Sequence, residues 1–290
     1  MLLNEYLRHK YGCKVYKLAL NGGFTCPNRD GTIDTRGCIF CSEGGSGEFT
    51  PDPRLSITEQ IERAKEKVAK KIANGKYIAY FQAFTGTYAP VERLKTLYTE
   101  AINHPDVVAL SIATRPDCLP DEVLDLLSEC NTIKPIWVEL GLQTVHEKSA
   151  RYIRRGYELP IYSEAVKKLR SLNIEVITHV IIGLPGEAKE DILDTVRYVC
   201  ESGATGIKLQ LLHILKGTDL EKEYREGKLR ILSEDEYIDI LKECVNVIPD
   251  NIVIHRLTGD GDKKLLVAPL WSADKKHVWN RIQKEVLYHI

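Results

Sequence analysis

Residues 22–41 read GGFTCPNRDGTIDTRGCIFC and place Cys26, Cys38 and Cys41 in the spacing C-x11-C-x2-C. A structural zinc ion takes four protein ligands, whereas three thiolates can hold a four-iron cluster and leave one iron open for another ligand. The spacing therefore predicts a [4Fe-4S] cluster on these cysteines, which would be its metal ligands and part of the catalytic centre. A zinc knuckle with a fourth ligand elsewhere, a Cys38–Cys41 redox pair and simple buried cysteines are the alternatives.

The composition is that of a globular protein: of 290 residues, 43% are hydrophobic and 28% are charged, which suits one α/β domain with a large core. No segment reaches the roughly 18 apolar residues of a membrane span, and the first residues lack the apolar core of a signal peptide. We therefore expect a cytoplasmic location, with the eight cysteines as reduced thiols or metal ligands. The formal net charge of -1 indicates no general affinity for nucleic acid, so a polyanionic partner would need local basic patches.

Six apolar segments that read as strands alternate with amphipathic helical segments. The predicted strands span residues 15–20, 77–84, 107–113, 136–140, 175–182 and 206–212. The predicted helices span residues 57–72, 90–103, 120–130, 161–172 and 189–201, with helical turns up to residue 153. Nearly continuous apolar strands separated by helices are typical of a parallel sheet covered by helices. The predicted fold class is therefore α/β, a partial (β/α)6 barrel, with its functional residues after the carboxyl ends of the strands.

The remaining residues predict a C-terminal extension, with a helix over residues 233–247, a strand over residues 251–257 and a final helix. We expect a core barrel over residues 1–215, with the cysteine loop at residues 22–47. The extension, residues 216–290, is expected to close the open side of the barrel and to form one compact unit with it.

These motifs resemble those of the radical S-adenosylmethionine (SAM) enzymes. The long first gap between the cysteines is similar to that of the branch around the catalytic subunit of Elongator, and TCPNRDG, GCIFC, TRPDCL and THVIIGLPGE resemble the YhcC/YtqA family of that branch. The resemblance implies a radical SAM barrel with a [4Fe-4S] cluster and SAM as cofactors. It further implies that an electron from a donor such as flavodoxin or ferredoxin cleaves SAM to methionine and a 5'-deoxyadenosyl radical, which removes hydrogen from the substrate.

The resemblance also assigns residues to SAM. Phe40 resembles the aromatic residue beside the adenine, and Gln82 and Thr85, in QAFTG, take the place of the segment that receives the methionine amino group. Glu139 and Gln143, in ELGLQ, resemble residues that reach the ribose and the methionine end. These five residues are therefore predicted to surround SAM.

Three further positions are implied to serve the cofactor. Arg155 resembles the arginine that pairs with the SAM carboxylate, Gly183, in GLPG, resembles the motif beside the adenine, and His179 stands where some relatives have an aspartate. Polar residues that follow other predicted strands are candidates for contact with the substrate: Arg115, His213, His255 and Arg256.

Members of the YhcC/YtqA family are linked to modification of the wobble uridine of tRNA, on the side chain at position five. The resemblance implies a step of the type that converts a carboxymethylaminomethyl group to an aminomethyl group. Basic clusters and aromatic side chains that suit an RNA partner are Lys65, Lys67, Lys70, Lys71, Arg151, Tyr152, Arg154, Arg155, Lys263, Lys264, Trp271, Lys275, Lys276, Trp279 and Arg281. The alternatives are a radical SAM oxidase of a small molecule such as a porphyrinogen, and a nonenzymatic metal-binding protein that holds a partner.

Overall fold

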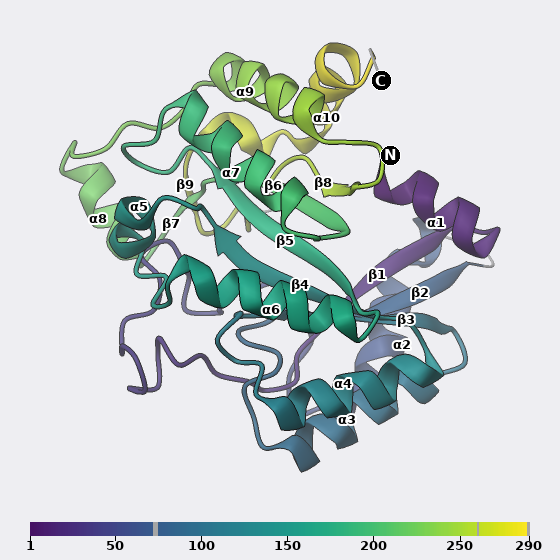
Figure 1. Cartoon of the computed structure of the whole chain (residues 1–290). Helices are drawn as coiled ribbons and strands as arrows, with labels where there is room; N and C mark the ends of the chain where they lie inside the picture. Colours follow the sequence, from purple (N-terminus) through teal and green to yellow (C-terminus); the bar gives the residue numbers. More distant parts are fainter. Residues whose placement is uncertain (72–74, 260, 289–290) are drawn as a thin grey trace.

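The main sheet has seven strands in the order β1-β2-β3-β4-β5-β6-β8, and every neighbouring pair is parallel. The computed structural model describes residues 1–71, 75–259 and 261–288. Because the strand order follows the chain, each connection returns to begin the next strand along the sheet, as in a (β/α) barrel that has not closed. Figure 1 shows the strands between the helices that connect them. The predicted α/β class and partial barrel are confirmed.

The elements lie close to their predicted positions. The strands of the main sheet are β1 (Val15–Leu20), β2 (Lys76–Phe81), β3 (Val107–Thr114), β4 (Ile136–Gln143), β5 (Glu175–Ile182), β6 (Gly206–Leu211) and β8 (Val253–Arg256), and a separate antiparallel pair is β7 (Ile214–Leu215) and β9 (Leu266–Ala268). The α-helices are α1 (Leu3–Tyr11), α2 (Ile57–Val68), α3 (Val91–Asn103), α4 (Asp121–Ile133), α5 (Glu147–Tyr152), α6 (Leu159–Ser171), α7 (Lys189–Glu201), α8 (Asp219–Arg225), α9 (Glu234–Val247) and α10 (Lys275–Arg281). The helix predicted over residues 57–72 corresponds to α2, and its expected end at residue 72 lies outside the described residues. No helix in the described ranges is both long and apolar enough to cross a lipid bilayer.

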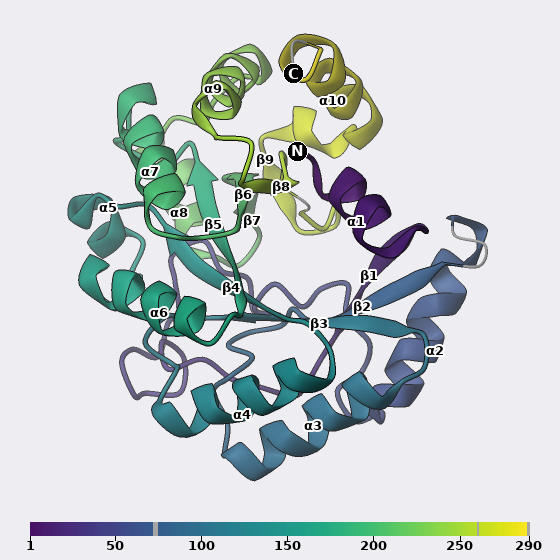
Figure 2. The same ribbon diagram turned by 45° about the vertical axis from the view of Figure 1, so that its right-hand side comes forward.

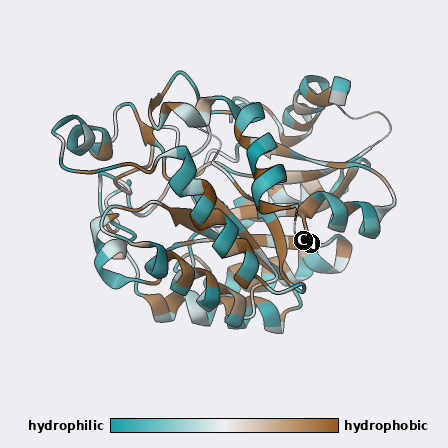
Figure 3. Ribbon diagram, turned by 90° about the horizontal axis from the view of Figure 1, so that it is seen from above, coloured by the Kyte–Doolittle hydropathy of each residue, from teal (hydrophilic) through white to brown (hydrophobic). Residues whose placement is uncertain are grey.

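The outward-facing side chains of the strands are apolar and are covered by helices. Leu18, Phe81 and Leu140 belong to one large core that also contains Leu94 of α3 and Leu127 of α4. Figure 2 shows α2, α3, α4, α6 and α7 in an arc around one side of the sheet. In Figure 3 the strands carry mostly hydrophobic residues, whereas the helices around them carry both kinds. Because successive side chains of a strand point to opposite faces, this covering leaves every second residue facing the inside of the barrel.

The inward-facing side chains form layers along the strands. At the amino ends lies an apolar layer that packs against Leu7 of α1 and consists of Val15, Ile78, Ala109, Trp137 and Ile177. Two residues further along the strands lies a polar and charged layer, which consists of Lys17, Tyr80, Ser111, Glu139, His179 and Lys208. Helix α1 therefore closes the amino end of the barrel, and the charged layer lies between that end and the carboxyl ends of the strands.

The C-terminal residues extend the sheet. Strand β8 pairs with β6, where Lys208 and Arg256 are neighbours in register, and α9 packs beside α7. The start of the chain lies at the same place, because Leu2 forms a β-bridge with Ile254 and the Ile254 N–H donates to Met1 O at 3.0 Å. Helix α1 thus runs between the two edge strands, β8 and β1. The predicted seventh strand is confirmed, while the division of the chain at residue 215 stays a prediction.

Replacing Leu7 with alanine is expected to lower the free energy of unfolding by about 2–5 kcal/mol, because a large-to-small change in a core removes apolar contact and leaves a cavity. Leu7 is only 3% exposed and packs in the apolar layer. Equilibrium unfolding in urea, followed by circular dichroism, measures the loss. Ile133→Ala is the control, since Ile133 is 62% exposed on α4 and should change stability by no more than about 0.5 kcal/mol. Similar losses in the two variants would show that α1 is not part of the core.

Candidate active site

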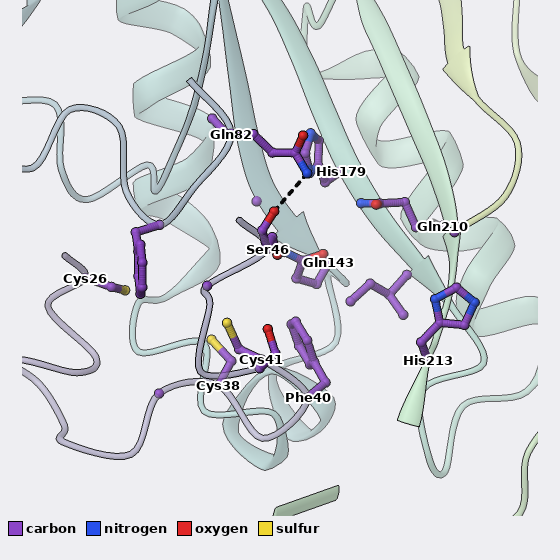
Figure 4. Close-up of a pocket in the computed structure, with 18 of the residues that line it drawn as sticks. Cys26, Cys38, Phe40, Cys41, Ser46, Gln82, Gln143, His179, Gln210 and His213 are labelled. Carbon is purple, nitrogen blue, oxygen red and sulfur yellow. Dashed lines mark hydrogen bonds between the residues drawn. The ribbon is translucent and has the colours of Figure 1, made fainter. Parts of the chain in front are cut away.

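The long loop between β1 and α2 carries the three predicted cysteines over the carboxyl ends of the strands. Cys26, Cys38 and Cys41 are free thiols, and all three line one cavity of about 280 Å³. Figure 4 shows Cys38 and Cys41 next to each other and Cys26 on a separate part of the loop. The Ile39 N–H, between these cysteines, donates to Ile153 O at 3.2 Å. The loop is therefore tied to the segment that follows β4, and its thiols face the inside of the barrel.

Burial disfavours the thiolate forms of Cys38 and Cys41. It raises the pKa of Cys38 and raises the pKa of Cys41 to about 12, while the guanidinium charges of Arg115 near Cys38 and of Arg29 near Cys41 act in the opposite direction. Asn28 Nδ2 also donates to Cys38 Sγ at 3.5 Å, a hydrogen bond that favours the charged form. Metal ligands must be deprotonated, so a bound iron centre would have to overcome the effect of burial on these thiols.

The donor set fits a [4Fe-4S] cluster. Cys26, Cys38 and Cys41 share one cavity, and their charges would interact with one another. Among the residues that the structure describes, no three His, Cys, Asp or Glu side chains are grouped to hold a single metal ion. Three thiols spread around a common space suit a cluster in which each thiolate binds a different iron.

All five residues predicted to surround SAM line the same cavity: Phe40, Gln82, Thr85, Glu139 and Gln143. Gln82 Nε2 donates to the carbonyl of Ser46 at 2.8 Å, which joins the end of β2 to the cysteine loop (Figure 4). Gln143 ends β4 with a φ of 70°, and its buried Oε1 has no hydrogen-bond partner in the described part of the chain. An unpaired buried oxygen on a strained residue costs free energy, so Gln143 is a group that a bound ligand would satisfy.

Two of the three arginines predicted to contact ligands, Arg155 and Arg115, already have partners in the protein. The guanidinium of Arg155 donates to Thr144 O at 2.7 Å and to Glu147 Oε1 at 3.0 Å. Arg115 forms an ion pair with Asp117 at 2.7 Å, and its Nη1 donates to the carbonyl of Arg155 at 2.8 Å. Both side chains line the cavity, so they brace the loops around it, and their contacts with SAM or substrate stay predictions.

The remaining candidates divide between the cavity and the structure around it. His213 and Arg256 line the cavity, whereas Gly183 and His255 are not among the described residues that do so. Gly183 turns at the end of β5 with a φ of 94°, where an added Cβ would lie 3.0 Å from Leu232. His255 packs edge-on against Trp137, with 5.3 Å between the ring centroids. Its side chain is therefore part of the packing inside the barrel.

Beneath the cavity, the carboxylate of Glu139 is fully buried and accepts four hydrogen bonds. Oε1 accepts from Lys17 Nζ at 2.5 Å and from Ser111 Oγ at 2.6 Å. Oε2 accepts from His179 Nε2 at 2.8 Å and from Lys208 Nζ. Both oxygens are thus committed to side chains of β1, β3, β5 and β6. The SAM contact predicted for Glu139 would have to replace one of these bonds, and it stays a prediction.

The charges of this layer shift each other's protonation. Burial alone would raise the pKa of Glu139, but the charges of Lys17 and Lys208 and the bond from His179 hold this pKa well below its usual value. Burial and the charge of Lys208 lower the pKa of His179 to about 4. Burial also lowers the pKa of Lys208 to about 7, despite the attraction of Glu139. At neutral pH the carboxylate is therefore ionised and the imidazole is neutral.

The sequence-based prediction missed Lys17, Ser111 and Lys208. Lys17 in VYKLAL and Lys208 in GIKLQL each interrupt an otherwise apolar strand. A charged side chain in a buried strand is costly unless it is paired, so this interruption is a signal that could have found both lysines. Ser111 carries no such signal, because a small hydroxyl side chain is common in strands.

The chain matches the family model of the Radical SAM superfamily over residues 31–199 and that of the Radical_SAM C-terminal domain over residues 204–287. It therefore belongs to the radical SAM superfamily, whose enzymes use a [4Fe-4S] cluster and SAM. Within that superfamily it is a member of the YhcC/YtqA family, since it is 47% identical to YtqA of Bacillus subtilis over 284 residues, or 98% of this chain and 88% of that protein.

Two further relatives belong to the Elongator-like branch. The tRNA uridine(34) acetyltransferase of Dehalococcoides mccartyi is 26% identical over 223 residues, which cover 71% of this chain and 48% of that enzyme. The structure of Elp3 from the archaeon Methanocaldococcus infernus matches with a TM-score of 0.68 and 16% identity over 93% of this chain and 63% of that chain. This second likeness confirms the fold.

His179 is expected to take up a proton only near pH 4 instead of near its usual pKa of 6.5. The unfolded chain takes up this proton near pH 6.5. Between pH 6.5 and 4, protons therefore bind the unfolded state more strongly than the folded state. The stability that the neutral His179 contributes is lost as the pH falls through this range. Nitrogen-15 NMR of the histidine rings across a pH series measures the midpoint, and His179→Gln assigns the signal. A midpoint near 6.5 would show that the imidazole is not held neutral in the layer.

Proposed function

We propose that this radical SAM enzyme modifies the side chain at position five of the wobble uridine of tRNA, by a step of the type that converts a carboxymethylaminomethyl group to an aminomethyl group. The observation that carries the proposal is the cavity between the three-cysteine loop and a floor of charged, hydrogen-bonding groups. Such a floor suits a small polar side chain that enters from the cysteine side. The similarity to a tRNA uridine(34) acetyltransferase supports the same class of nucleoside.

In this proposal Cys26, Cys38 and Cys41 hold the cluster, while Phe40 and Gln143 contact SAM. When bound, the two cofactors supply the removal of a hydrogen atom from an unactivated carbon. The chain itself orients the substrate and keeps water away from the reacting carbon. Phe40 packs against a separate apolar cluster under the loop, which consists of Ile39, Ile153, Ile181, Leu184, Leu212, Ile214, Leu220 and Ala268.

The basic residues predicted to suit RNA differ in their surroundings. Lys65 and Arg154 form ion pairs with acidic neighbours, and Trp271 packs against the main core. The Lys275 ammonium lies 5.6 Å from the ring centroid of Phe49, and Phe49 lines the cavity. We therefore place the RNA beside α10 and the cysteine loop. An electron donor such as flavodoxin or ferredoxin is part of the same proposal.

Anaerobically reconstituted protein, reduced with dithionite and incubated with SAM and bulk tRNA from cells that lack the protein, is expected to form 5'-deoxyadenosine and to change the mass of a wobble uridine. Cys38→Ala should lower both products by more than about 100-fold, because loss of a ligand exceeds the about 10–100-fold effect of changes around a metal site. Mass spectrometry of the nucleosides, with 5'-deoxyadenosine measured in the same samples, gives both readouts.

Cys200→Ala is the matched control, because Cys200 is a free, half-buried cysteine on α7 outside the cavity lining. This variant should keep both products. Cleavage of SAM with every tRNA nucleoside unchanged would mean that the substrate is not tRNA. Equal products from Cys38→Ala and the wild type would remove the cysteine loop from the active site.

A further inference from the structure

The charged layer contains more cationic than anionic side chains. Lys17 and Lys208 bind the carboxylate of Glu139, and Arg256 lies beside Lys208 in the strand register, while His179 is neutral at pH 7. Lys17, Ser111, His179 and Lys208 together donate four hydrogen bonds to the two oxygens of Glu139, so the carboxylate has no acceptor site left for a third cation. Unbalanced charge in a buried space is costly. The low pKa of Lys208 reflects this imbalance, since burial and the charges of Lys17 and Arg256 oppose its protonation.

Arg256 is the cation of this group whose side chain has no hydrogen-bond or ion-pair partner among the described residues. It ends β8 and lines the cavity, and its guanidinium faces no described carboxylate within ion-pair distance. Its strand register places it beside Lys208 on β6, and the Lys208 ammonium is held by Glu139 and by Tyr80 OH at 3.3 Å. A planar guanidinium suits two-point binding of a carboxylate. Lys208 and Arg256 therefore present neighbouring donors to the inner end of the cavity.

Other charged groups at the cavity do not balance this pair. The cavity-lining carboxyl of Glu48 accepts a hydrogen bond from Ser42 Oγ in the cysteine loop. Asp262 also lines the cavity, and its Oδ1 accepts the backbone N–H of Lys264 at 2.9 Å. Neither carboxyl has an ion pair with Lys208 or Arg256 in the described part of the chain. The inner end of the cavity is thus suited to an anion from a ligand.

We propose that Lys208 and Arg256 form a subsite for the carboxylate of the substrate side chain. The assignment rests on the proposed function in one respect, because a carboxymethylaminomethyl group ends in a carboxylate. With this carboxylate at the floor and the uracil nearer the cysteine loop, the carbons of the side chain lie between the two. The subsite would distinguish this side chain from uncharged side chains of similar size.

The test compares two synthetic anticodon stem–loops, one with the carboxymethylaminomethyl acid and one with its carboxamide, which has the same size but no charge. Dissociation constants are measured by fluorescence anisotropy under anaerobic conditions, with the cluster and SAM bound. The wild type should bind the acid at least about 10-fold more tightly than the amide, a difference typical of one charge-assisted contact. Arg256→Gln should bind both within about 2-fold, and Arg256→Lys should restore part of the preference.

Arg256→Gln removes no hydrogen bond between described residues, so the variant should fold, and its melting temperature checks this. Lys208→Met is a second variant that should also lose the preference for the acid. Lys95→Gln, an exposed residue of α3 that is paired only with Glu129, is the control and should keep it. Equal binding of acid and amide by the wild type would overturn the subsite, whether or not 5'-deoxyadenosine forms.

The outcomes separate the subsite from the proposed function. Binding of the acid in preference to the amide, without 5'-deoxyadenosine or a change in the uridine, would support the subsite and contradict the proposed reaction. If neither RNA binds, the proposed function fails, and the subsite is decided with N-methylglycine and its amide. If the subsite exists, only the acid should raise the melting temperature of the wild type, and Arg256→Gln should abolish this rise. No rise with the acid would overturn the subsite.

Discussion

One buried carboxylate organises the inside of this barrel. Glu139 on β4 accepts hydrogen bonds from β1, β3, β5 and β6, so it links one edge of the sheet to the strand next to the other edge. Taking an ion out of water costs several kcal/mol, and attraction offsets this cost only where further hydrogen bonds complete the set. The four donors meet this condition. They explain how two lysines can lie inside a sheet whose outer face is an apolar core, and why the layer forms only when all these strands are in register.

The sequence predicted the elements better than it predicted their contacts, for a physical reason. Strands, helices and the cysteine spacing are local patterns, and β1 to β6 lie within a few residues of their expected ranges. The partners of Glu139 depend on register between strands, and Lys17 lies 122 residues away from it. The same holds for Arg155, whose guanidinium binds loop groups near β4, and for Gly183, which faces Leu232 instead of the cavity. The lysines stand out among the apolar residues of their strands, but no local pattern indicates which side chain they contact.

The cysteine loop depends on a different set of interactions. Arg29 Nη2 donates to Cys41 O at 2.9 Å and to Ser42 O at 2.5 Å, and its guanidinium lies 5.8 Å from the ring centroid of Phe84. These contacts of the Arg29 side chain hold the loop in shape around the thiols. The floor is built on strands, whose positions are fixed by the core, while the thiols are carried by a loop held by hydrogen bonds within itself and to neighbouring segments. Sites on strands are positioned more rigidly than sites on loops.

This division has a consequence for selectivity. The cysteines have Arg29 and Arg115 as their cationic neighbours, whereas Lys208 and Arg256 lie at the floor. SAM and a carboxymethylaminomethyl substrate each carry a carboxylate, so one shared cationic region would let them compete. In the proposed function, the two anions would be bound in separate regions, one at the loop and one at the floor. Specificity is a difference between affinities, and an uncharged side chain at the floor would leave Arg256 and Lys208 desolvated without an anion. In the proposed function, the rigid strands would therefore select the substrate, and the loop would hold the cofactors that act on it.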